Sequence, residues 1–487
     1  MKDRIYIKDL KNYIGKEIII AGWVDIRRDQ GKMVFFDMRD MTGKVQCVVL
    51  PGKNSPTKNL GAFALGDIGQ GTHDAKNSLL GNLAKEIRPE WVLKITGIVN
   101  KRPDKNINDE ILNGDIELEA TGIEILNRAE TTPFQINEDT IGINEDIRMK
   151  YKYLDLRSER MQKNIRMRDK IVSFFRIYMH KNDFIEIETP MMTKGTPEGS
   201  REYVVPSRLW HGKFYVLPQS PQQFKQLCMV AGFEKYFQIA RCMRDEDTRG
   251  DRQPEFTQLD YEMSFVNQEE ILIYTESMFI ELIKNIYPEK KIVKIPFPRI
   301  TYKESMEKYG SDKPDLRTDK EDPNELAFCW IVDFPMFEKT DDGMQATHHP
   351  FCSIKEEDKE KFMEGKDIFS IRANAYDLVL NGYELSSGSI RIHEKDVQKQ
   401  VFKLLNISEE EQQKKFGHML EAFTYGAPPH GGFAPGIDRI VMILQNEPNI
   451  REVIAFPKTG EGKDLMMGSP SEISEKQLKE LGIKLSK

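Results

Sequence analysis

The sequence predicts an α+β protein of two domains, a small β-barrel followed by a larger domain of mixed helices and strands. Three observations lead to this class. Short runs of strand character, separated by turn residues, fill the region from residue 17 to about residue 128. From Tyr151 onward the apolar residues adopt helical spacing, and helices then alternate with strands. The length of 487 residues suffices for two to four domains, at roughly 100–200 residues each.

The N-terminal region has the pattern of a five-stranded barrel. Strands are predicted at residues 17–28, 32–40, 44–50, 91–103 and 116–129, a loop over 51–80, and a short helix before the fourth strand. Five short strands with a helix between the third and fourth are typical of an OB barrel, although another small β-domain fits the same pattern. We therefore expect a barrel over 1–128, a linker over 129–150 and a second domain over 151–487.

Composition limits the classes of function. The net charge of −7 argues against sequence-independent wrapping of nucleic acid, which needs a basic surface. It leaves room for local basic patches such as RRDQGK and MRDMTGK in the first fifty residues. The five cysteines form no CxxC pair, so reduced thiols are expected. No signal peptide or apolar run of about 18 residues is found, and the cytoplasm is the expected location, without a membrane.

The segment YFQIARCMRDEDTRGDRQPEFTQLDYE, residues 236–262, is the most informative of the chain. Two runs of strand character flank a charged stretch, which predicts a hairpin. Arg244 and Glu246 are two apart in the first run, and Gln258 and Asp260 are two apart in the second. Alternation therefore places each pair on one face of its strand. A surface with a guanidinium, carboxylates and an amide suits a phosphate, a metal ion and an amine.

Two further segments carry recognisable patterns. In GGFAPGIDRIVMIL, residues 431–444, glycines and Pro435 lead into an apolar helix with Arg439 in its first turn, where the positive helix end favours an anion. Upstream, apolar residues recur at helical spacing and run into the strand FIEIETP, which ends at Pro190. The apolar residues of this helix are Ile171, Phe174, Phe175, Tyr178 and Met179.

A second hairpin is predicted over residues 375–392, with Asn381-Gly382 as its turn. Asp377 and Glu384 flank this turn. If the loop has two residues, Val379 faces Glu384 and Asp377 lies diagonal to it on the same face. Two such carboxylates can share a divalent cation with a phosphate ligand. An exposed acidic pair is the alternative.

Taken together, these segments resemble class II aminoacyl-tRNA synthetases, with motif 1 at about 165–190, motif 2 at about 236–262 and motif 3 at about 426–444. The resemblance to the bacterial aspartyl-tRNA synthetases covers nearly the whole chain. It is carried by TPEGSR, QSPQQFKQ, GSDKPDLR, WIVDFPMF, THHPF, NGYELSSGSIRIH and GAPPHGGFAPGIDR.

The resemblance implies an antiparallel catalytic sheet, an OB barrel that reads the anticodon, and a homodimer formed through motif 1. It implies L-aspartate, ATP, Mg²⁺ and tRNA(Asp) as substrates and cofactors, with tRNA(Asn) as a second tRNA in some members. The implied catalytic residues are Arg244, Arg439 and Glu384. The implied aspartate-binding residues are Glu198, Ser220, Gln222, Lys225, Arg244, Asp260, His348 and Arg391.

The remaining implied residues bind ATP, metal and tRNA. For ATP they are Arg244, Asp245, Glu246, Gln253, Glu384, Gly436, Ile437, Asp438 and Arg439. For Mg²⁺ they are Asp377 and Glu384. For the anticodon they are Phe35, which would stack on an unpaired base, Gln46 and Glu117. Lys225 and Arg391 provide the fixed cations that a substrate with a side-chain carboxylate needs.

The sequence departs from the family pattern at three places. The inserted domain that bacterial members carry between motifs 2 and 3 is absent, because GSDKPDLR at 310–317 passes to WIVDFPMF at 330 through a short connector. Pro435 replaces a residue that is commonly apolar or aromatic. Gln30 stands where members that charge only tRNA(Asp) often carry Leu and relaxed members often carry His. An amide both donates and accepts, which favours a relaxed enzyme.

Other functions compete with this interpretation. A lysine-specific relative would need an acidic side-chain pocket, and an asparagine-specific relative would not need two cations. A catalytically silent paralogue that binds RNA or a regulator would typically have lost a motif arginine or an acidic metal ligand. All four of these residues, Arg244, Arg439, Asp377 and Glu384, are present.

Overall fold

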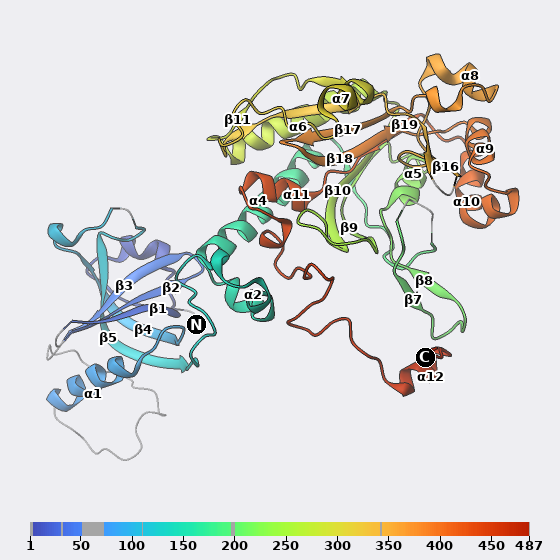
Figure 1. Cartoon of the computed structure of the whole chain (residues 1–487). Helices are drawn as coiled ribbons and strands as arrows, with labels where there is room; N and C mark the ends of the chain where they lie inside the picture. Colours follow the sequence, from blue (N-terminus) through green and yellow to red (C-terminus); the bar gives the residue numbers. More distant parts are fainter. Residues whose placement is uncertain are drawn as a thin grey trace. The chain divides into compact units, whose positions relative to one another are not determined.

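The computed structural model describes residues 3–30, 33–50, 73–109, 111–195, 200–340 and 343–486. It divides into two compact units, Met1–Ile141 and Gly142–Lys487, drawn in Figure 1. The division falls inside the linker expected over 129–150. The last residues of that stretch form helix α2 (Glu145–Lys150) of the second unit. Glu198 and residues 51–72 of the predicted loop lie outside the described residues.

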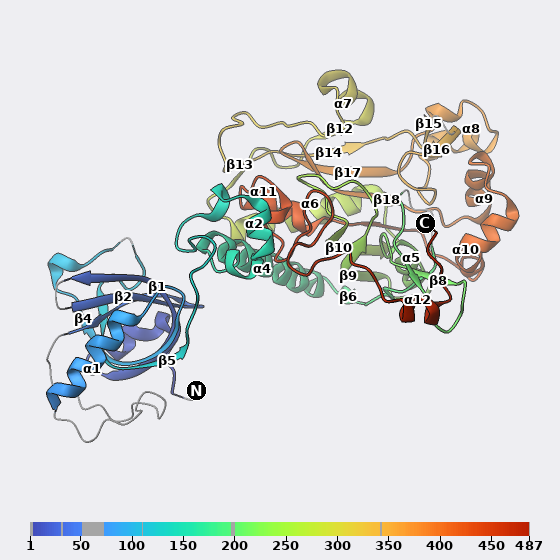
Figure 2. The same cartoon turned by 60° about the horizontal axis from the view of Figure 1, so that its bottom comes forward.

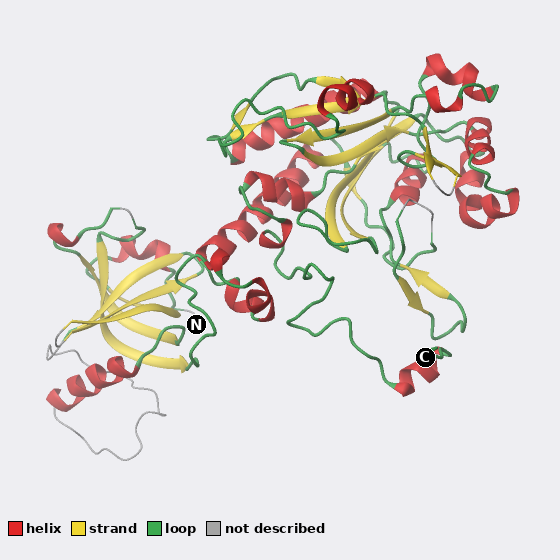
Figure 3. Ribbon diagram, viewed as in Figure 1, coloured by secondary structure: helices red, strands yellow, loops and turns green. Residues whose placement is uncertain are grey.

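The first unit is a closed five-stranded barrel, as the strand pattern predicted. Its strands are β1 (Glu17–Gln30), β2 (Met33–Asp40), β3 (Gly43–Val49), β4 (Val92–Lys101) and β5 (Ile116–Asn127), in the order β1-β2-β3-β5-β4. Alternate residues such as Ile95, Val99 and Leu118 are fully buried and fill the barrel. The predicted helix is present as α1 (His73–Glu86) and starts inside the stretch predicted as a loop. Figure 3 shows how strands dominate this unit.

The second unit is built on an eight-stranded sheet in the order β12-β14-β17-β18-β19-β10-β9-β6. The six central strands run antiparallel, whereas each edge strand runs parallel to its neighbour. The strands are β6 (Ile185–Glu186), β9 (Lys235–Met243), β10 (Glu255–Ser264), β12 (Arg299–Thr301), β14 (Phe328–Val332), β17 (Ala375–Leu380), β18 (Tyr383–Ile390) and β19 (His430–Phe433).

One face of this sheet is covered by helices. Helices α6 (Gln268–Ile286) and α11 (Ile437–Leu444) contact the sheet, and α4 (Glu159–Lys181) packs against both (Figure 2). The helix predicted around Ile171 and Phe175 is α4, and both side chains are fully buried in this core. A capping box formed by Asn267 and Glu270 fixes the start of α6. The opposite face of the sheet is left for polar residues and α5 (Gln222–Val230).

The remaining elements surround the sheet. The helices are α3 (Lys152–Asp155), α7 (Tyr302–Tyr309), α8 (Lys359–Met363), α9 (Lys395–Leu404), α10 (Glu409–Phe423) and α12 (Glu475–Leu481). The strand pairs are β7 (Val204–Pro206) with β8 (Phe214–Val216), β11 (Lys291–Ile292) with β13 (Glu325–Leu326), and β15 (Phe337–Thr340) with β16 (Gly343–Ala346). Among the described residues, no helix has the length and apolar character needed to cross a membrane.

Candidate active site

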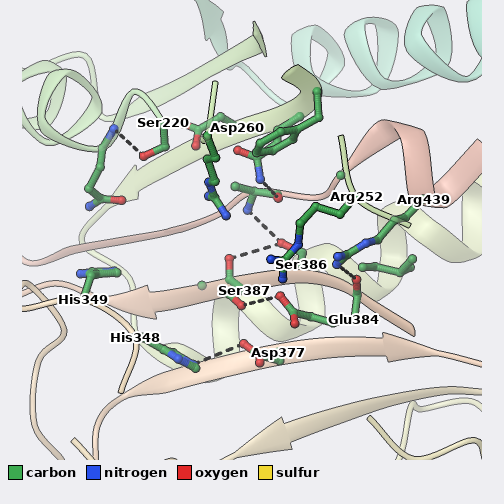
Figure 4. A pocket seen from close by; sticks show the side chains of 18 of the residues that line it. Ser220, Arg252, Asp260, His348, His349, Asp377, Glu384, Ser386, Ser387 and Arg439 are labelled. Atoms are coloured by element: carbon green, nitrogen blue, oxygen red, sulfur yellow. Dashed lines mark hydrogen bonds and ion pairs between the residues drawn. The ribbon is translucent and has the colours of Figure 1, made fainter. Parts of the chain in front are cut away.

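A cavity of about 540 Å³ opens on the polar face of the eight-stranded sheet. This volume is in the range of small-molecule sites. Figure 4 shows side chains from several separate segments pointing into it. They come from α5, β10, the loop between β9 and β10, the β17–β18 hairpin, the start of α11, and the segments around Lys313 and His348.

Alternation along β10 divides its side chains between core and cavity. Leu259 and Tyr261 are fully buried in the core under the helices, whereas Gln258 and Asp260 line the cavity. The alternation predicted for Gln258 and Asp260 is therefore present. The predicted strand position of Arg244 and Glu246 is wrong, because β9 ends at Met243. Both residues lie in the connecting loop, where the Arg244 amide donates to Pro254 O at 2.8 Å, and both still line the cavity.

Four charged side chains meet at one end of the cavity. Lys225 Nζ donates to Asp260 Oδ2 at 2.9 Å and lies 3.3 Å from Glu262 Oε2. Arg391 donates to both oxygens of Glu262, from Nε at 2.8 Å and from Nη2 at 3.1 Å. None of the four side chains is more than 2% exposed. Lys225, Asp260 and Arg391 therefore form this end of the cavity, and Glu262 lies behind the two cations and balances their charge.

The tandem histidines lie between these charges and the β17–β18 hairpin. Arg391 Nη1 donates to His349 Nε2 at 2.8 Å. Burial lowers the pKa of His349 well below its ordinary value, and the Arg391 cation lowers it further. Burial likewise lowers the pKa of His348. Both imidazoles are therefore neutral near pH 7 and act as polar groups rather than charges.

The β17–β18 hairpin has the two-residue turn that the sequence predicted. Val379 faces Glu384 across it, and Asn381 and Gly382 both have positive φ. A bulge next to Val379 shifts the register, so that Asp377 faces Ser387 instead. This shift was not predicted. It brings Ser387 Oγ to 3.2 Å from Glu384 Oε1, as Figure 4 shows.

The two hairpin carboxylates differ in their surroundings. Burial and the nearby Glu384 carboxylate raise the pKa of Asp377 well above its ordinary value. Burial also raises the pKa of Glu384, but the cations of Lys313 and Arg439 bring it below the ordinary value. Lys313 Nζ lies 2.9 Å from Glu384 Oε2. A single cation at Asp377 would relieve the repulsion between the two acids.

Two arginines lie toward the other end of the cavity. Arg439, in the first turn of α11, donates from Nη1 to Glu384 O at 2.7 Å and pairs with Asp251 at 3.1 Å. The Arg244 guanidinium lies over the ring of Phe256, 5.0 Å from its centre. These arginines are placed to neutralise an extended anion, and Phe256 offers a flat apolar face.

Several predicted ATP-binding residues bond to the protein itself. Gln253 exchanges two hydrogen bonds with the backbone of Lys458. Asp438 accepts from the Thr257 amide at 2.9 Å and from Arg168 at 2.5 Å. Glu246 pairs with Arg252 at 2.7 Å. These three side chains still line the cavity, as does Gly436.

Two predicted ATP-binding residues are not part of the cavity wall. Ile437 is fully buried in the core below the sheet, because it lies on the apolar face of α11. Asp245 lies in the β9–β10 loop, where its amide donates to Arg201 O and its own carbonyl accepts from Arg201 Nε. Their side chains are therefore not placed to contact a ligand in this cavity.

Several buried polar atoms of the cavity wall lack a hydrogen-bond partner, as do some buried polar atoms elsewhere in the described residues. Among the described residues, Asp260 Oδ1, Asp377 Oδ1, His348 Nε2 and Gln222 Nε2 have no hydrogen-bond partner. His348 Nε2 lies 3.4 Å from Asp377 Oδ1 without forming a hydrogen bond. Unsatisfied buried polar atoms are rare in proteins, so a ligand with a positive group near Asp260 and a cation near Asp377 would complete the site.

The sequence interpretation assigned no role to three residues of this region. Glu262 continues the alternation of Gln258 and Asp260, which was a usable signal. Phe256 begins the same alternation. Lys313 lies in the GSDKPDLR segment, about 70 residues before Glu384, and no local pattern could pair the two. Ser220, the other predicted residue on this side, lines the cavity, and its Oγ accepts from the Gln222 amide.

The predicted anticodon residues share one outer surface of the barrel. Phe35 on β2, Gln46 on β3 and Glu117 on β5 belong to neighbouring strands and alternate with fully buried residues. Asp37, opposite Gln46, binds Arg28 at 3.0 Å. Gln30 is exposed at the end of β1. A half-buried aromatic ring beside polar groups suits an unpaired base.

Comparison with known families gives two matches. The model described as tRNA synthetases class II (D, K and N) matches residues 144–460. The model described as OB-fold nucleic acid binding domain matches residues 18–126. Together they cover both structural units.

Similar proteins match over nearly their whole length. The aspartate–tRNA(Asp/Asn) ligase of Rubrobacter xylanophilus is 40% identical over 597 aligned positions, covering 97% of this chain and 95% of that protein. The ligase of the same name from Natranaerobius thermophilus is 39% identical and both proteins are covered completely. The aspartate–tRNA ligase of Staphylococcus aureus is 37% identical, with 97% of each covered.

Solved structures share the fold. Aspartyl-tRNA synthetase from Entamoeba histolytica superposes with a TM-score of 0.69 at 22% identity, over 93% of this chain and 91% of that chain. Asparaginyl-tRNA synthetase from Pyrococcus horikoshii, complexed with asparaginyl-adenylate, gives a TM-score of 0.71 at 20% identity, over 94% of this chain and 99% of that chain.

Proposed function

We propose that this chain, which belongs to the class II tRNA synthetases of the D, K and N group, is an aspartate–tRNA ligase. It activates L-aspartate with ATP and transfers it to the 3′ end of tRNA(Asp). The observation that carries the choice of amino acid is the pair of buried cations, Lys225 and Arg391, at one end of the cavity. Relatives of about 40% identity over nearly the whole chain bear the same activity in their names.

The reaction needs positioning and charge neutralisation, and no nucleophilic side chain. An α-carboxylate oxygen of aspartate forms a bond to the α-phosphorus of ATP. The bond from that phosphorus to the oxygen bridging to the β-phosphate breaks, and pyrophosphate leaves. A hydroxyl at the 3′ end of the tRNA then attacks the carbonyl carbon of aspartyl-adenylate, and AMP leaves. Arginines held in place can stabilise the charge that develops.

The amino acid is bound through opposite charges at its two ends. Lys225 and Arg391 hold the side-chain carboxylate, and the unsatisfied Asp260 Oδ1 accepts from the ammonium group. Gln222, whose Nε2 has no partner among the described residues, donates to the substrate. Ser220 and His348 complete the pocket wall. Glu198, outside the described residues, is proposed as a second partner of the ammonium group.

The nucleotide lies along the other end of the cavity. Arg244 contacts the α-phosphate and the substrate carboxylate through its planar fork of donors. Arg439, at the positive start of α11, holds the γ-phosphate. Glu246 accepts from the adenine amino group, and the Phe256 ring, which lies beside Arg244, stacks on the base.

Asp377 and Glu384 suit a Mg²⁺ ion shared with the phosphates. Asp377 Oδ1 is buried and unsatisfied, and carboxylate oxygens are the ligands that a hard cation prefers. Among the described residues no group of three or more His, Cys, Asp or Glu is arranged to hold a metal alone. Phosphate oxygens would therefore supply the missing ligands. When bound, Mg²⁺ neutralises charge on the triphosphate.

A homodimer is the proposed assembly, in the cytoplasm with its tRNA. Ile177 on α4 is 68% exposed, and Ile185 on the edge strand β6 is 46% exposed. Exposed apolar side chains beside the edge strand of a sheet favour a partner at this surface. This is the surface that motif 1 implies for the second subunit.

The competing functions fit the cavity less well. Asparagine carries no charge on its side chain, so the two buried cations would remain without a ligand of opposite charge, and lysine would add a third positive charge beside them. A silent paralogue would have no need to keep Arg244, Arg439, Asp377 and Glu384 on one cavity wall.

Pyrophosphate exchange into ATP tests the proposal. Exchange is expected with L-aspartate and not with L-asparagine or L-lysine, because the pocket cations select a side-chain carboxylate. Exchange with asparagine instead would assign the protein to the asparagine-specific relatives. No exchange with any of the three would favour the silent paralogue.

We also propose that tRNA(Asn) is charged along with tRNA(Asp). Gln30 lies on the barrel strand that precedes β2 and Phe35, and its amide satisfies either a cytosine or a uracil edge. Several relatives carry tRNA(Asp/Asn) in their names, whereas that of S. aureus does not. Gln30→Leu is expected to lower charging of tRNA(Asn) relative to tRNA(Asp), measured with the two purified tRNAs. Wild-type protein that charges tRNA(Asp) alone would contradict the broader activity.

A further inference from the structure

Glu262 lies behind Lys225 and Arg391, the two cations of the pocket, and contacts both. Its side chain is fully buried and does not line the cavity. It accepts two hydrogen bonds from Arg391, at 2.8 and 3.1 Å, and lies 3.3 Å from Lys225 Nζ. Burial raises the pKa of Glu262, but Arg391 and Lys225 hold it below its ordinary value, so the carboxylate is ionised.

The two cations have no other carboxylate in common among the described residues. Lys225 comes from α5, and Arg391 follows the last residue of β18. Asp260 bonds to Lys225, whereas the other contacts of the Arg391 guanidinium are neutral, to Ser389 Oγ at 2.5 Å and to His349 at 2.8 Å. Glu262 is therefore the link that fixes Arg391 relative to Lys225.

The neighbouring strand makes room for this carboxylate. Gly432 on β19 lies directly opposite Glu262. A Cβ atom at residue 432 would lie 1.9 Å from Glu262 Oε2 and 2.2 Å from the carbonyl oxygen of Tyr261. The Glu262 side chain thus occupies space that any residue larger than glycine would fill.

We propose that Glu262 is a positioning residue that determines specificity, because it holds Lys225 and Arg391 at the spacing that one side-chain carboxylate can bridge. The inference rests on the proposed function, in which these cations bind the side chain of aspartate. Glu262 itself does not touch the substrate.

The sign of a change in affinity separates this role from a purely electrostatic one. Removing a negative charge from behind the pocket would, by charge alone, strengthen the binding of an anionic side chain. Removing the link between the cations would weaken it, because Arg391 would keep only its neutral contacts. Glu262→Gln is isosteric and loses the charge, whereas Glu262→Asp keeps the charge and shortens the reach by one methylene.

The test is pyrophosphate exchange by the full-length wild type and the two variants. Both are expected to raise the KM for aspartate at least about tenfold, since a misplacement of about 1 Å can cost a factor of about 10². The KM for ATP and the inhibition constant of L-asparagine as a competitor are expected to stay within about twofold, because neither ligand depends on the cation spacing. Glu276→Gln is the matched control. Glu276 is another buried carboxylate of this unit, bonded to Trp330 at 3.0 Å and outside the cavity wall.

Three results would overturn the proposal. One is a KM for aspartate in Glu262→Gln that is equal to or lower than that of the wild type. Another is a wild-type KM for aspartate in Glu262→Asp. This second result alone overturns the proposal if the glutamine variant does not fold. The third is a parallel rise for aspartate, ATP and asparagine, which would indicate general damage. Wild-type protein without aspartate-dependent exchange would instead contradict the proposed function itself, before any variant is compared.

Discussion

Arg244 is the residue on which the activation step depends most directly in this account. Its backbone bonds to Pro254, and its guanidinium lies over Phe256 at the cavity wall, so it is held before any ligand arrives. Preorganised donors of this kind stabilise a developing charge without further rearrangement.

Arg244→Ala is therefore expected to lower the rate of aspartate-dependent exchange more than about a hundredfold, which corresponds to roughly 3 kcal/mol. Arg241→Ala is the control, because Arg241 lies on β9, shortly before Arg244, and forms a half-exposed pair with Glu255. Rates are measured by steady-state exchange and folding by circular dichroism. A folded Arg244 variant with near-normal exchange would remove the residue from the mechanism.

Much of the site at the residue scale could be predicted because its residues lie in short local patterns. Asp260 follows from strand alternation, and Arg439 from the start of an apolar helix. Asp245 and Ile437 were taken from the same motifs, but a motif does not tell which side chain faces the core. Lys313 could not be found, because its contact with Glu384 joins segments far apart in sequence.

At the scale of elements, α2 and α4 are joined to the turn η6 (Ile450–Glu452) by one buried carboxylate. Glu452 accepts from Arg148 at 2.9 Å through both oxygens and from Arg160 at 2.9 Å. Although burial opposes it, these cations lower the pKa of Glu452 from 4.5 to about 2. The neighbouring Ile450 lines the cavity, so this cluster supports the active-site wall.

This cluster gives stability a dependence on pH. Because the folded-state pKa lies below the unfolded value, the contribution is complete above pH 4.5 and is lost as the pH falls toward 2. Glu452→Gln is expected to lower the free energy of unfolding by about 3 kcal/mol at pH 7. In urea titrations the difference from wild type should shrink between pH 5 and pH 3. A difference that does not change with pH would contradict the assignment.

The β17–β18 hairpin is the element that binds metal in this account. Its two-residue turn follows from Asn381-Gly382, but the bulge that turns Ser387 toward Glu384 is a property of the whole sheet and leaves no signature in the sequence.

Asp377→Asn is expected to weaken the binding of Mn²⁺ with ATP at least about tenfold, measured by electron paramagnetic resonance. Unchanged Mn²⁺ affinity would separate Asp377 from the metal.

At the scale of the whole molecule, the chain is shorter than the relatives with which it aligns. Alignments span 597 and 613 positions against 487 residues, consistent with the inserted domain that the sequence lacks. The short connector at the place of the inserted domain is held by hydrogen bonds. The buried Glu325 accepts from the amides of Thr318 and Asp319 at 3.0 and 2.8 Å, and β13 pairs with β11.

Because the connector is closed by its own hydrogen bonds, the protein is expected to form a dimer and charge tRNA without the inserted domain. Sedimentation velocity reports the assembly, and aminoacylation reports the activity of the same preparation. Grafting the inserted domain of a relative between Arg317 and Trp330 provides the comparison. A monomeric or aggregated protein that charges only after grafting would show that the gap is a defect.

Aminoacylation tests most directly whether one cavity selects aspartate for attachment to tRNA. Purified tRNA(Asp) is incubated with the wild-type protein, ATP, Mg²⁺ and radiolabelled aspartate, and parallel reactions contain asparagine or lysine. Acid-precipitable label is expected with aspartate alone, and this label is expected to be lost in Arg391→Leu. Label from asparagine, or no label from any amino acid by folded protein, would contradict this selection of aspartate.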